Sequence, residues 1–410
     1  MIRAIKGTRD ILPPQSTIWN HVEATVRRVF RSYNYEEIRT PIFEETALFA
    51  RGVGEETDIV TKEMYTFADR DGTSLTLRPE NTASVIRAYI EHRLDQRPGI
   101  AKLYYIGPMF RRERPQKGRY RQFFQIGAEA IGTTSPTIDA EVIEMVTVAL
   151  SECGLKDFHL VINSVGDKES RAAYIERLRE DLAPVKDQLT EDNQRRAVTN
   201  PLRVLDSKAP EDEAIIAKLP SILDFLNDDC RAHFATVRRL LDERGIQYEV
   251  RPRLVRGLDY YTHTTFEIVH GALGAQNSVM GGGRYNGLAE SLGAKQPAPG
   301  IGFSIGEDRL IMGVEESTKL ETGPEIFVAY LSEEAGTPAR KLAYDLRQRG
   351  RRVEVALDAR LKRSLELANK IGARQVAILG YSELPPNGAM LKDMGTGEQK
   401  QVTIEELLGN

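Results

Sequence analysis

The segment RRERPQKGRYR, residues 111–121, is the part of the sequence best suited to chemistry, because six of its eleven residues are basic and one is acidic. Arginine side chains form charge-assisted, paired hydrogen bonds with phosphates, and the glycine and proline of this segment would allow close approach to a ligand or an RNA end. Such a run is most often a solvated surface. Here, apolar strand-like runs at 102–110 and 122–132 flank it, which predicts the tip of an antiparallel hairpin. A long loop at such a position is more often functional, so we expect it to bind phosphate.

Glu80 and Glu129 are the acidic residues whose positions suggest a binding site. Glu80 follows a strand-like run and begins a helical one, where a first-turn acid would also suit the helix dipole. Glu129 lies in an apolar strand-like run, where a carboxylate is costly unless it is paired, so it is the better candidate. Downstream, Arg256 opens the segment RGLDYYT. Its adjacent tyrosines, Tyr260 and Tyr261, would point to opposite faces of a strand, one into the core and the other into a pocket.

Several common catalytic and nucleotide-binding patterns are absent from the sequence. There is no GxxxxGK[ST] segment, and GxGxxG fails because Asn286 follows Gly281 and Gly283 where the third glycine belongs. The GxSxG pattern around Ser304 resembles a hydrolase nucleophile elbow, but that fold places its histidine after the serine, and the last histidine here is His270. The small residues around Ser304 are expected instead to let a helix pack closely on a sheet. The histidines form no HxxxH or HExxH pair, so no metal site is expected.

The first 323 residues combine strand-like and helical runs, which predicts a mixed, largely antiparallel sheet with helices. Helical period is clear over 16–32, and Ser135 and Pro136 match the N-cap and first position of a helix that extends to about 152. From about 167 to 244 the pattern is helical and charged, which predicts a helical insertion. A helix is also expected from Pro79 to about 93. Strand-like runs are expected at 36–44, 73–81, 102–110, 122–132, 158–165, 246–255, 264–270 and 277–283, with a strand and then a helix at 299–314.

After Gly323 and Pro324 the pattern changes to strands alternating with helices. Strand-like runs occur at 326–331, 353–357 and 375–380, and helical runs occur at 337–349 and 361–371. This β-α-β-α-β order predicts a small separate α/β domain of about 85 residues with a mainly parallel sheet.

Length and composition set the broad class of protein. The chain has 410 residues, 41% hydrophobic and 28% charged, which fits a globular protein of two or three domains and excludes a disordered, collagenous or membrane-spanning chain. Two cysteines cannot form a disulfide framework, and the first residues lack the apolar stretch of a signal peptide, so we expect a cytoplasmic protein with no membrane partner. The net charge of -4, from 56 basic and 60 acidic residues, indicates that any basic site is local.

Several segments, taken in their order along the chain, form a recognisable set. The opening KGTRDILP comes first, followed by the helix and strand that end at Pro41, then FRRERPQKGRYRQF and GIGFSIGEDRL. The last three resemble motifs 1, 2 and 3 of class II aminoacyl-tRNA synthetases, motif 1 being a dimer-interface element. LTLRPENTA, LVRGLDYYTHTTFE and GGGRYNGL are narrower and resemble the histidine-specific segments of one family. Over essentially its whole length, the chain resembles the histidyl-tRNA synthetase family.

The resemblance implies an α+β fold. It consists of a class II antiparallel-sheet catalytic domain with a helical insertion and a C-terminal α/β anticodon-binding domain. The expected boundaries are 1–166 for the catalytic core with motifs 1 and 2, 167–244 for the insertion, 245–323 for the rest of the core, with the histidine-specific segments and motif 3, and 326–410 for the anticodon-binding domain.

The resemblance also implies roles for individual residues. ATP would be bound by Arg111, Glu113, Arg119 and Arg309. Histidine would be bound by Glu80, Thr82, Arg111, Gln125, Glu129, Arg256, Tyr260, Tyr261 and Tyr285. Arg111 and Arg256 would be catalytic at the α-phosphate, Arg256 standing where other class II enzymes place a metal. Glu129 would accept a hydrogen bond from the imidazole, with help from Tyr261, and Gln116 would meet the tRNA acceptor end.

The implied reaction has two steps: histidine and ATP give histidyl-adenylate and pyrophosphate, and histidine then moves to the 3′ end of tRNA(His). Mg²⁺ would enter with ATP, held mainly by its phosphates, and no structural metal bound by the protein is expected. A second copy of the chain is the expected protein partner, as a homodimer. Attack of a carboxylate on the α-phosphorus brings two anions together, and each preorganised cation would stabilise the transition state by about 3–4 kcal/mol.

Two alternatives and three departures accompany this interpretation. A non-catalytic paralogue, the regulatory subunit of ATP phosphoribosyltransferase, shares the catalytic fold but generally lacks RGLDYY-type residues and the anticodon domain, both of which occur here. An RNA-binding module without chemistry would not need the paired arginines and two placed acids. Asn81, Asn286 and Asp308 stand where the family commonly has glycine, aspartate and glutamate, and these changes affect the expected fine geometry.

Overall fold

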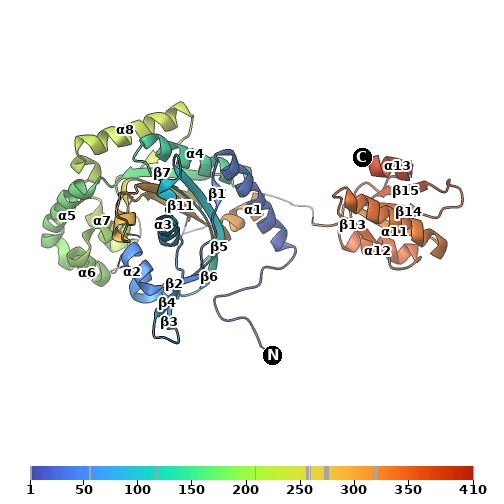
Figure 1. Ribbon diagram of the computed structural model, residues 1–410, viewed down its shortest axis with the longest axis horizontal. Helices are drawn as coiled ribbons and strands as arrows, with labels where there is room; N and C mark the ends of the chain where they lie inside the picture. Colours follow the sequence, from blue (N-terminus) through green and yellow to red (C-terminus); the bar gives the residue numbers. More distant parts are fainter. Residues whose placement is uncertain are drawn as a thin grey trace. The chain divides into compact units, whose positions relative to one another are not determined.

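The computed structural model divides the chain into two compact units, Met1–Thr318 and Lys319–Asn410 (Figure 1). It describes residues 2–54, 57–116, 118–207, 209–254, 258, 260–271, 277–317 and 322–409.

An eight-stranded sheet is the centre of the first unit, with the order β1-β5-β6-β11-β10-β9-β7-β8. Only the pairs β1/β5 and β7/β8 are parallel, so the sheet is mainly antiparallel, as the sequence predicts. The strands are β1 (Glu36–Glu37), β5 (Ala101–Phe110), β6 (Gln122–Ile131), β7 (Phe158–Ser164), β8 (Glu249–Val250), β9 (Thr262–His270), β10 (Ser278–Arg284) and β11 (Gly300–Gly306). β8 is much shorter than the run predicted at 246–255, because Pro252 has no N–H with which to continue the ladder.

The two faces of this sheet have different coverings, because successive side chains of a strand alternate between them. Ile126, Ala128 and Ala130 of β6 pack into a core with α1 (Gln15–Ser32), α4 (Pro136–Glu152) and α10 (Glu307–Ser317). Ile131 instead packs with α3 (Thr82–Glu91) and α9 (Leu288–Ser291). Figure 1 shows the strands between α3 on one side and α1 on the other. Residues 125, 127 and 129 therefore face the α3 side.

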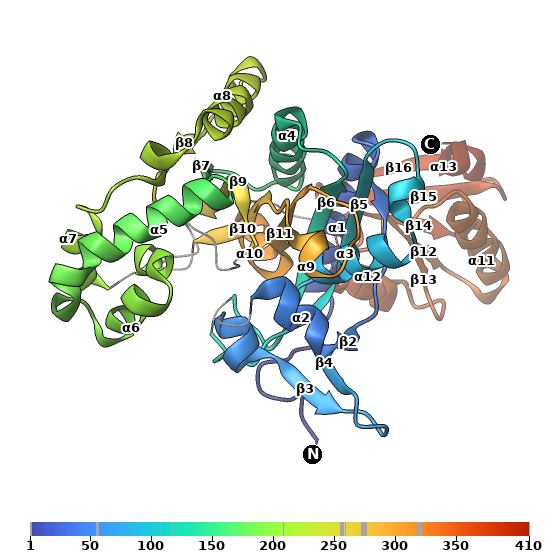
Figure 2. The ribbon, with the colours of Figure 1, turned by 60° about the vertical axis from the view of Figure 1, so that its left-hand side comes forward.

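A smaller sheet with the order β2-β4-β3 lies next to α2 (Thr46–Val53), as Figure 2 shows. Its strands are β2 (Phe43–Glu45), β3 (Tyr65–Ala68) and β4 (Ser74–Leu77). β4 leads through Pro79 into α3, so this sheet sets where the first turn of α3 lies.

Between β7 and β8 the described residues form helices and no strand, as the sequence predicts. Tyr174, Leu178 and Leu182 of α5 belong to a separate hydrophobic core of this segment. The helices are α5 (Lys168–Leu182), α6 (Glu191–Thr199), α7 (Pro210–Ile216) and α8 (Asp228–Glu243), with short 3-10 helices at Ala183–Gln188, Pro201–Asp206 and Ile222–Phe225. Figure 2 shows α5, α6 and α7 together at the left of the strands.

The second unit contains a five-stranded sheet with the order β13-β12-β14-β15-β16. The predicted parallel strands are present, but β15 and β16 form an antiparallel hairpin that the sequence analysis missed. α11 begins at Glu333, before the predicted start at 337, because the side chain of Ser332 caps Ala335 N. The elements are β12 (Ile326–Tyr330), α11 (Glu333–Gln348), β13 (Val353–Val355), α12 (Leu361–Lys370), β14 (Gln375–Leu379), β15 (Gly388–Asp393), β16 (Gln399–Thr403) and α13 (Ile404–Gly409).

Candidate active site

A cavity of about 260 Å³ lies on the α3 side of the large sheet and brings together most of the predicted site residues. Its lining includes Glu80, Thr82, Arg111, Glu113, Arg119, Gln125, Tyr260, Tyr261, Tyr285 and Arg309. These residues come from α3, the β5–β6 hairpin, the segment before β9, the end of β10 and the start of α10. Three predicted residues are not part of this lining: Glu129 is buried and hydrogen-bonded to the lining residues Thr82 and Tyr285, Gln116 is exposed on the hairpin loop, and Arg256 lies outside the described residues.

One end of the cavity is cationic. The loop between β5 and β6 forms the predicted hairpin tip, closed by the backbone pair Gln116 and Arg119. Arg119 Nη1 donates to Glu113 Oε2 over 2.9 Å. Arg309 Nε donates to the carbonyl of Gly118 over 3.2 Å, and Nη1 donates to the carbonyl of Ser278 over 2.7 Å. Burial, followed by the charges of Arg119 and Arg111, lowers the pKa of Arg309. We call Arg111, Glu113, Arg119 and Arg309 the cationic end.

A second part of the cavity lining, which we call the acidic end, begins at Glu80, just before α3. Glu80 is buried and accepts hydrogen bonds from the backbone N–H groups of Thr82, over 2.7 Å, and Ala83, over 3.0 Å. The expected first-turn position is wrong, because Glu80 lies two residues before α3, but its carboxylate still accepts two N–H groups of that turn, and the residue also lines the cavity. Burial raises the pKa of Glu80. Arg111 reaches the same region, because its Nε donates to the carbonyl of Pro79 over 2.9 Å.

Glu129 also belongs to this acidic end, 1% exposed and two residues before the last residue of β6. Its Oε1 accepts a hydrogen bond from the hydroxyl of Thr82 over 2.8 Å, and its Oε2 accepts one from the hydroxyl of Tyr285 over 2.6 Å. Burial raises the pKa of Glu129 to about 8. A buried carboxylate with hydroxyl partners and no paired cation among the described residues is suited to receive an N–H group from a ligand.

The expectation for the small residues around Ser304 is wrong at Gly302. Gly302 pairs with Glu129 across β11 and β6. A Cβ atom at Gly302 would overlap the Glu129 carboxylate, so this glycine makes room for an acid, and not for a packed helix. Ser304, two residues later on the same face, lines the cavity.

The predicted opposite orientation of Tyr260 and Tyr261 is also wrong. Both rings line the cavity, with their centroids 4.7 Å apart. The alternation rule does not apply because β9 begins only at Thr262, so the two tyrosines belong to the turn before the strand. Tyr260 also meets Tyr285 edge to face, at 5.9 Å between centroids.

Residues 7–310 match the protein family described as Histidyl-tRNA synthetase. The chain belongs to this family. Residues 325–410 match the family described as Anticodon binding domain. The predicted fold class is thereby confirmed, with a class II antiparallel catalytic sheet and a C-terminal α/β anticodon-binding domain.

Individual relatives within the histidyl-tRNA synthetase family cover nearly the whole chain. A histidine–tRNA ligase of Solibacter usitatus is 64% identical over 99% of this chain and 98% of its own length. One of Koribacter versatilis is 57% identical, covering 99% and 95%. The solved structure of apo histidyl-tRNA synthetase from S. aureus has a TM-score of 0.79 and 40% identity, covering 100% of this chain and 99% of that one. A Bacillus halodurans structure titled as an ATP phosphoribosyltransferase regulatory subunit/histidyl-tRNA synthetase, at 22% identity and a TM-score of 0.68, covers 93% of this chain and 99% of its own and shares the fold.

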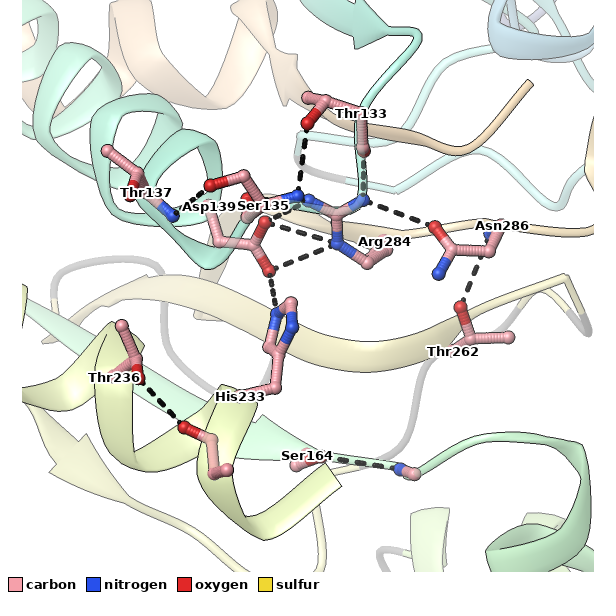
Figure 3. Close-up of polar contacts among 12 residues, drawn as sticks. Thr133, Ser135, Thr137, Asp139, Ser164, His233, Thr236, Thr262, Arg284 and Asn286 are labelled. Atoms are coloured by element: carbon pink, nitrogen blue, oxygen red, sulfur yellow. Dashed lines mark hydrogen bonds and ion pairs between the residues drawn. The ribbon is translucent and has the colours of Figure 1, made fainter. Parts of the chain in front are cut away.

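A buried ion pair that the sequence analysis missed involves Arg284, the residue directly before Tyr285. Arg284, the last residue of β10, and Asp139 of α4 are both fully buried and paired (Figure 3). Arg284 also donates to the carbonyls of Thr133 and Ser135 and to Asn286 Oδ1, so all five of its N–H donors are used. The sequence did contain a signal for this pair, because an arginine at the end of an apolar strand-like run needs a buried acid as a partner.

His233 of α8 completes this cluster, a position that the sequence analysis did not assign to any histidine. Its Nε2 lies 2.8 Å from Asp139 Oδ2, an oxygen that also accepts a hydrogen bond from Arg284 Nε (Figure 3). Burial alone would raise the pKa of Asp139, but the hydrogen bond from His233 and the charge of Arg284 hold that pKa below its ordinary value. The helical segment is thereby joined to the end of β10, directly before Tyr285.

The departures at Asn81 and Asn286 each place a side-chain oxygen that accepts a hydrogen bond, although Asn81 Nδ2 is buried with no partner among the described residues. Asn81 precedes α3 and accepts a hydrogen bond from the hydroxyl of Thr40 over 2.6 Å. Asn286 accepts from Arg284 over 3.2 Å without adding a second negative charge beside Asp139.

Among the described residues, no helix has the length and apolar character needed to cross a membrane.

Proposed function

We propose that the protein ligates L-histidine to tRNA(His) in two steps, forming histidyl-adenylate from ATP and then transferring histidine to the tRNA 3′ end. The observation that carries this proposal is one cavity whose lining combines three arginines, Arg111, Arg119 and Arg309, with the buried acid Glu80. The names of the close relatives support the ligase over the regulatory-subunit alternative, which shares only the fold with this chain.

The cationic end of the cavity would bind ATP. Arg111 lies between the two ends of the cavity, so it would contact both the α-phosphate and the histidine carboxylate. Arg119 and Arg309 would bind the outer phosphates, and Glu113 would orient Arg119 through their existing ion pair. Planar guanidinium groups held in place before substrate arrives would stabilise the charge that develops on the phosphoryl oxygens. Mg²⁺ belongs to the substrate here, entering with ATP on its phosphates.

The proposed role of Arg256 beside the α-phosphate is based only on the resemblance of the segment RGLDYYT to the family. Replacing it with alanine should lower adenylation by about two decades or more while leaving the fold intact. Adenylation rates equal to those of the unmodified enzyme would remove Arg256 from the catalytic set.

The acidic end would select histidine. Glu80 and Thr82 would hold the α-amino group, and Glu129 would accept a hydrogen bond from the imidazole N–H. Gln125, whose Oε1 has no hydrogen-bond partner among the described residues, would supply a further contact. Tyr260, Tyr261 and Tyr285 would close the pocket around the ring. A pocket built to pair with an N–H group rejects analogues without it by about 10⁴-fold, because the buried carboxylate would remain unpaired.

The proposal extends to the rest of the molecule. Exposed Gln116 would contact the tRNA acceptor end, and residues 326–410 would bind the anticodon. We retain the boundaries 1–166 and 245–323 for the catalytic core and 167–244 for the insertion. Ile42, Phe43 and Phe67 are exposed on the smaller sheet, an apolar surface that a second copy would cover in a cytoplasmic homodimer.

The deciding experiment is an amino-acid panel in the ATP–pyrophosphate exchange assay. Exchange should depend on histidine and should be absent with other amino acids. Exchange with another amino acid in place of histidine would refute the substrate assignment, and no exchange with any amino acid would refute adenylation.

A further inference from the structure

Arg9 contacts two parts of the ATP-binding region from outside the cavity. It belongs to residues 2–14, which form neither helix nor strand before α1 begins. Its Nη2 donates to Asp308 Oδ1 over 2.7 Å. Its guanidinium also lies over the ring of Tyr120, 4.5 Å from the centroid, and 5.7 Å from that of Trp19. Arg9 does not itself line the cavity.

Tyr120 and Asp308 are each adjacent in sequence to an arginine of the cationic end. Tyr120 follows Arg119 on the hairpin loop, and Asp308 precedes Arg309 at the start of α10. Asp308 is 4% exposed, and its second oxygen accepts the backbone N–H of Phe124 over 3.0 Å. Asp308 therefore ties α10 to the start of β6, while Arg9 supplies the cation that a buried aspartate needs.

A second contact fixes the same segment to the hairpin. The carbonyl of Gly7 accepts the backbone N–H of Arg121 over 2.7 Å. Gly7 has a φ of +92°, and a Cβ there would lie 2.7 Å from Cγ of Arg121, so only glycine allows this close approach. The N-terminal segment is consequently attached to the hairpin loop at two points, Gly7 and Arg9.

We propose that Arg9 is a positioning residue for the ATP triphosphate, because it fixes the hairpin loop and the start of α10 relative to each other through Tyr120 and Asp308. This inference rests on the proposed adenylation reaction. Arg119 and Arg309 lie on those two elements and would need a fixed separation to bind the outer phosphates together. The aspartate at 308, where the family commonly has glutamate, is the acid that Arg9 pairs with here.

The test compares full-length Arg9→Ala, Arg9→Lys and Asp308→Asn with the unmodified protein in histidine-dependent pyrophosphate exchange. Arg9→Ala should raise the KM for ATP by about ten-fold, because its loss would let Arg119 and Arg309 shift relative to the ATP phosphates. The KM for histidine should stay within about two-fold, because the acidic end has no contact with Arg9. Arg9→Lys keeps the ion pair but loses the planar stack on Tyr120, so its KM for ATP should be intermediate. Arg3→Ala, in the same segment and exposed, is the matched control and should behave as the unmodified protein.

A double variant and a binding measurement separate positioning from stability. Arg9→Ala with Asp308→Asn should be no worse than the more severe single variant, because the two residues act through one contact. The rise in unfolding temperature that ATP produces without histidine should be smaller in Arg9→Ala. A lower unfolding temperature with an unchanged KM for ATP, or equal rises in both KM values, would overturn the proposal. If the unmodified protein shows no histidine-dependent exchange, the adenylation proposal fails, but the ATP-induced rise in unfolding temperature still tests the role of Arg9. If Arg9→Ala does not fold, the KM values of Arg9→Lys and Asp308→Asn test the proposal instead.

Discussion

Glu129 and Gly302 face each other across the β6/β11 pair, and the carboxylate of one occupies the space that a side chain at the other would fill. The glycine thus determines whether an acid can be placed in the interior of this sheet. Once there, the acid is paired only with hydroxyl groups among the described residues, those of Thr82 and Tyr285. The selectivity of the proposed histidine pocket depends on this cross-strand relationship.

Gly302→Ala should abolish histidine-dependent exchange almost completely. The new methyl group would displace the Glu129 carboxylate, and a shift of about 1 Å in a positioned group can cost 10²-fold in rate. Gly287→Ala is the matched control, since a Cβ there has no atom within 4 Å. Both variants would be assayed for exchange and for ATP binding. Normal exchange in Gly302→Ala would show that the position of Glu129 is not needed for histidine activation.

Glu129→Gln should change how the stability of the empty enzyme depends on pH. The pKa of Glu129 is about 8 in the folded protein against an ordinary value of 4.5, so the folded state holds an extra proton between these values. Stability of the unmodified protein therefore falls as pH rises through this window. Glutamine cannot ionise, so the variant should gain stability relative to the unmodified protein as pH rises toward 8.

Unfolding temperatures measured at several pH values between 5 and 9 would check this, with histidine-dependent exchange measured in parallel. The variant should lose exchange at every pH, because bound histidine would favour the ionised form of Glu129, which only accepts hydrogen bonds, whereas the amide of glutamine also donates them. A stability difference that does not change with pH would mean that Glu129 ionises normally.

Removal of residues 326–410 should harm aminoacylation of tRNA far more than histidine-dependent exchange. The cavity is lined entirely by residues of the first unit, and the second unit has a hydrophobic core of its own. Aminoacylation and exchange would be measured on the same preparation of the shortened chain. Equal loss of both activities would contradict a separate tRNA-binding role for this domain.

Local signals in the sequence were sufficient for much of the scaffold. Ser135 and Pro136 predict the start of α4, and the apolar runs on both sides of residues 111–121 predict the hairpin. Each of these features is set by residues close together in the chain. The proposed roles of site residues came from segments that resemble a family, and the structure brings ten of those residues to one cavity.

The features that sequence analysis missed depend on pairing between distant residues. Gly302 is opposite Glu129 only because of the register of β6 and β11, which no local pattern specifies. Tyr260 and Tyr261 were given opposite orientations because they were expected to lie in a strand, whereas β9 begins only at Thr262. The pairing of Arg284 with Asp139 joins residues that are 145 apart in the chain, so neither alone predicts the other.

Asp139→Asn should destabilise the first unit by about 3 kcal/mol or more, because it leaves the Arg284 guanidinium buried without a counter-charge. The substitution keeps the side-chain volume, so the effect isolates the lost charge. Glu243→Ala removes the acid of an exposed helical pair with Arg239 and should cost about 0.5 kcal/mol or less. Urea unfolding followed by the fluorescence of Trp19, the single tryptophan and a member of this unit's core, would measure both variants. Because Tyr285 is the residue after Arg284, Asp139→Asn should also raise the KM for histidine more than the KM for ATP; a large loss of stability with no such difference would limit the ion pair to a folding role.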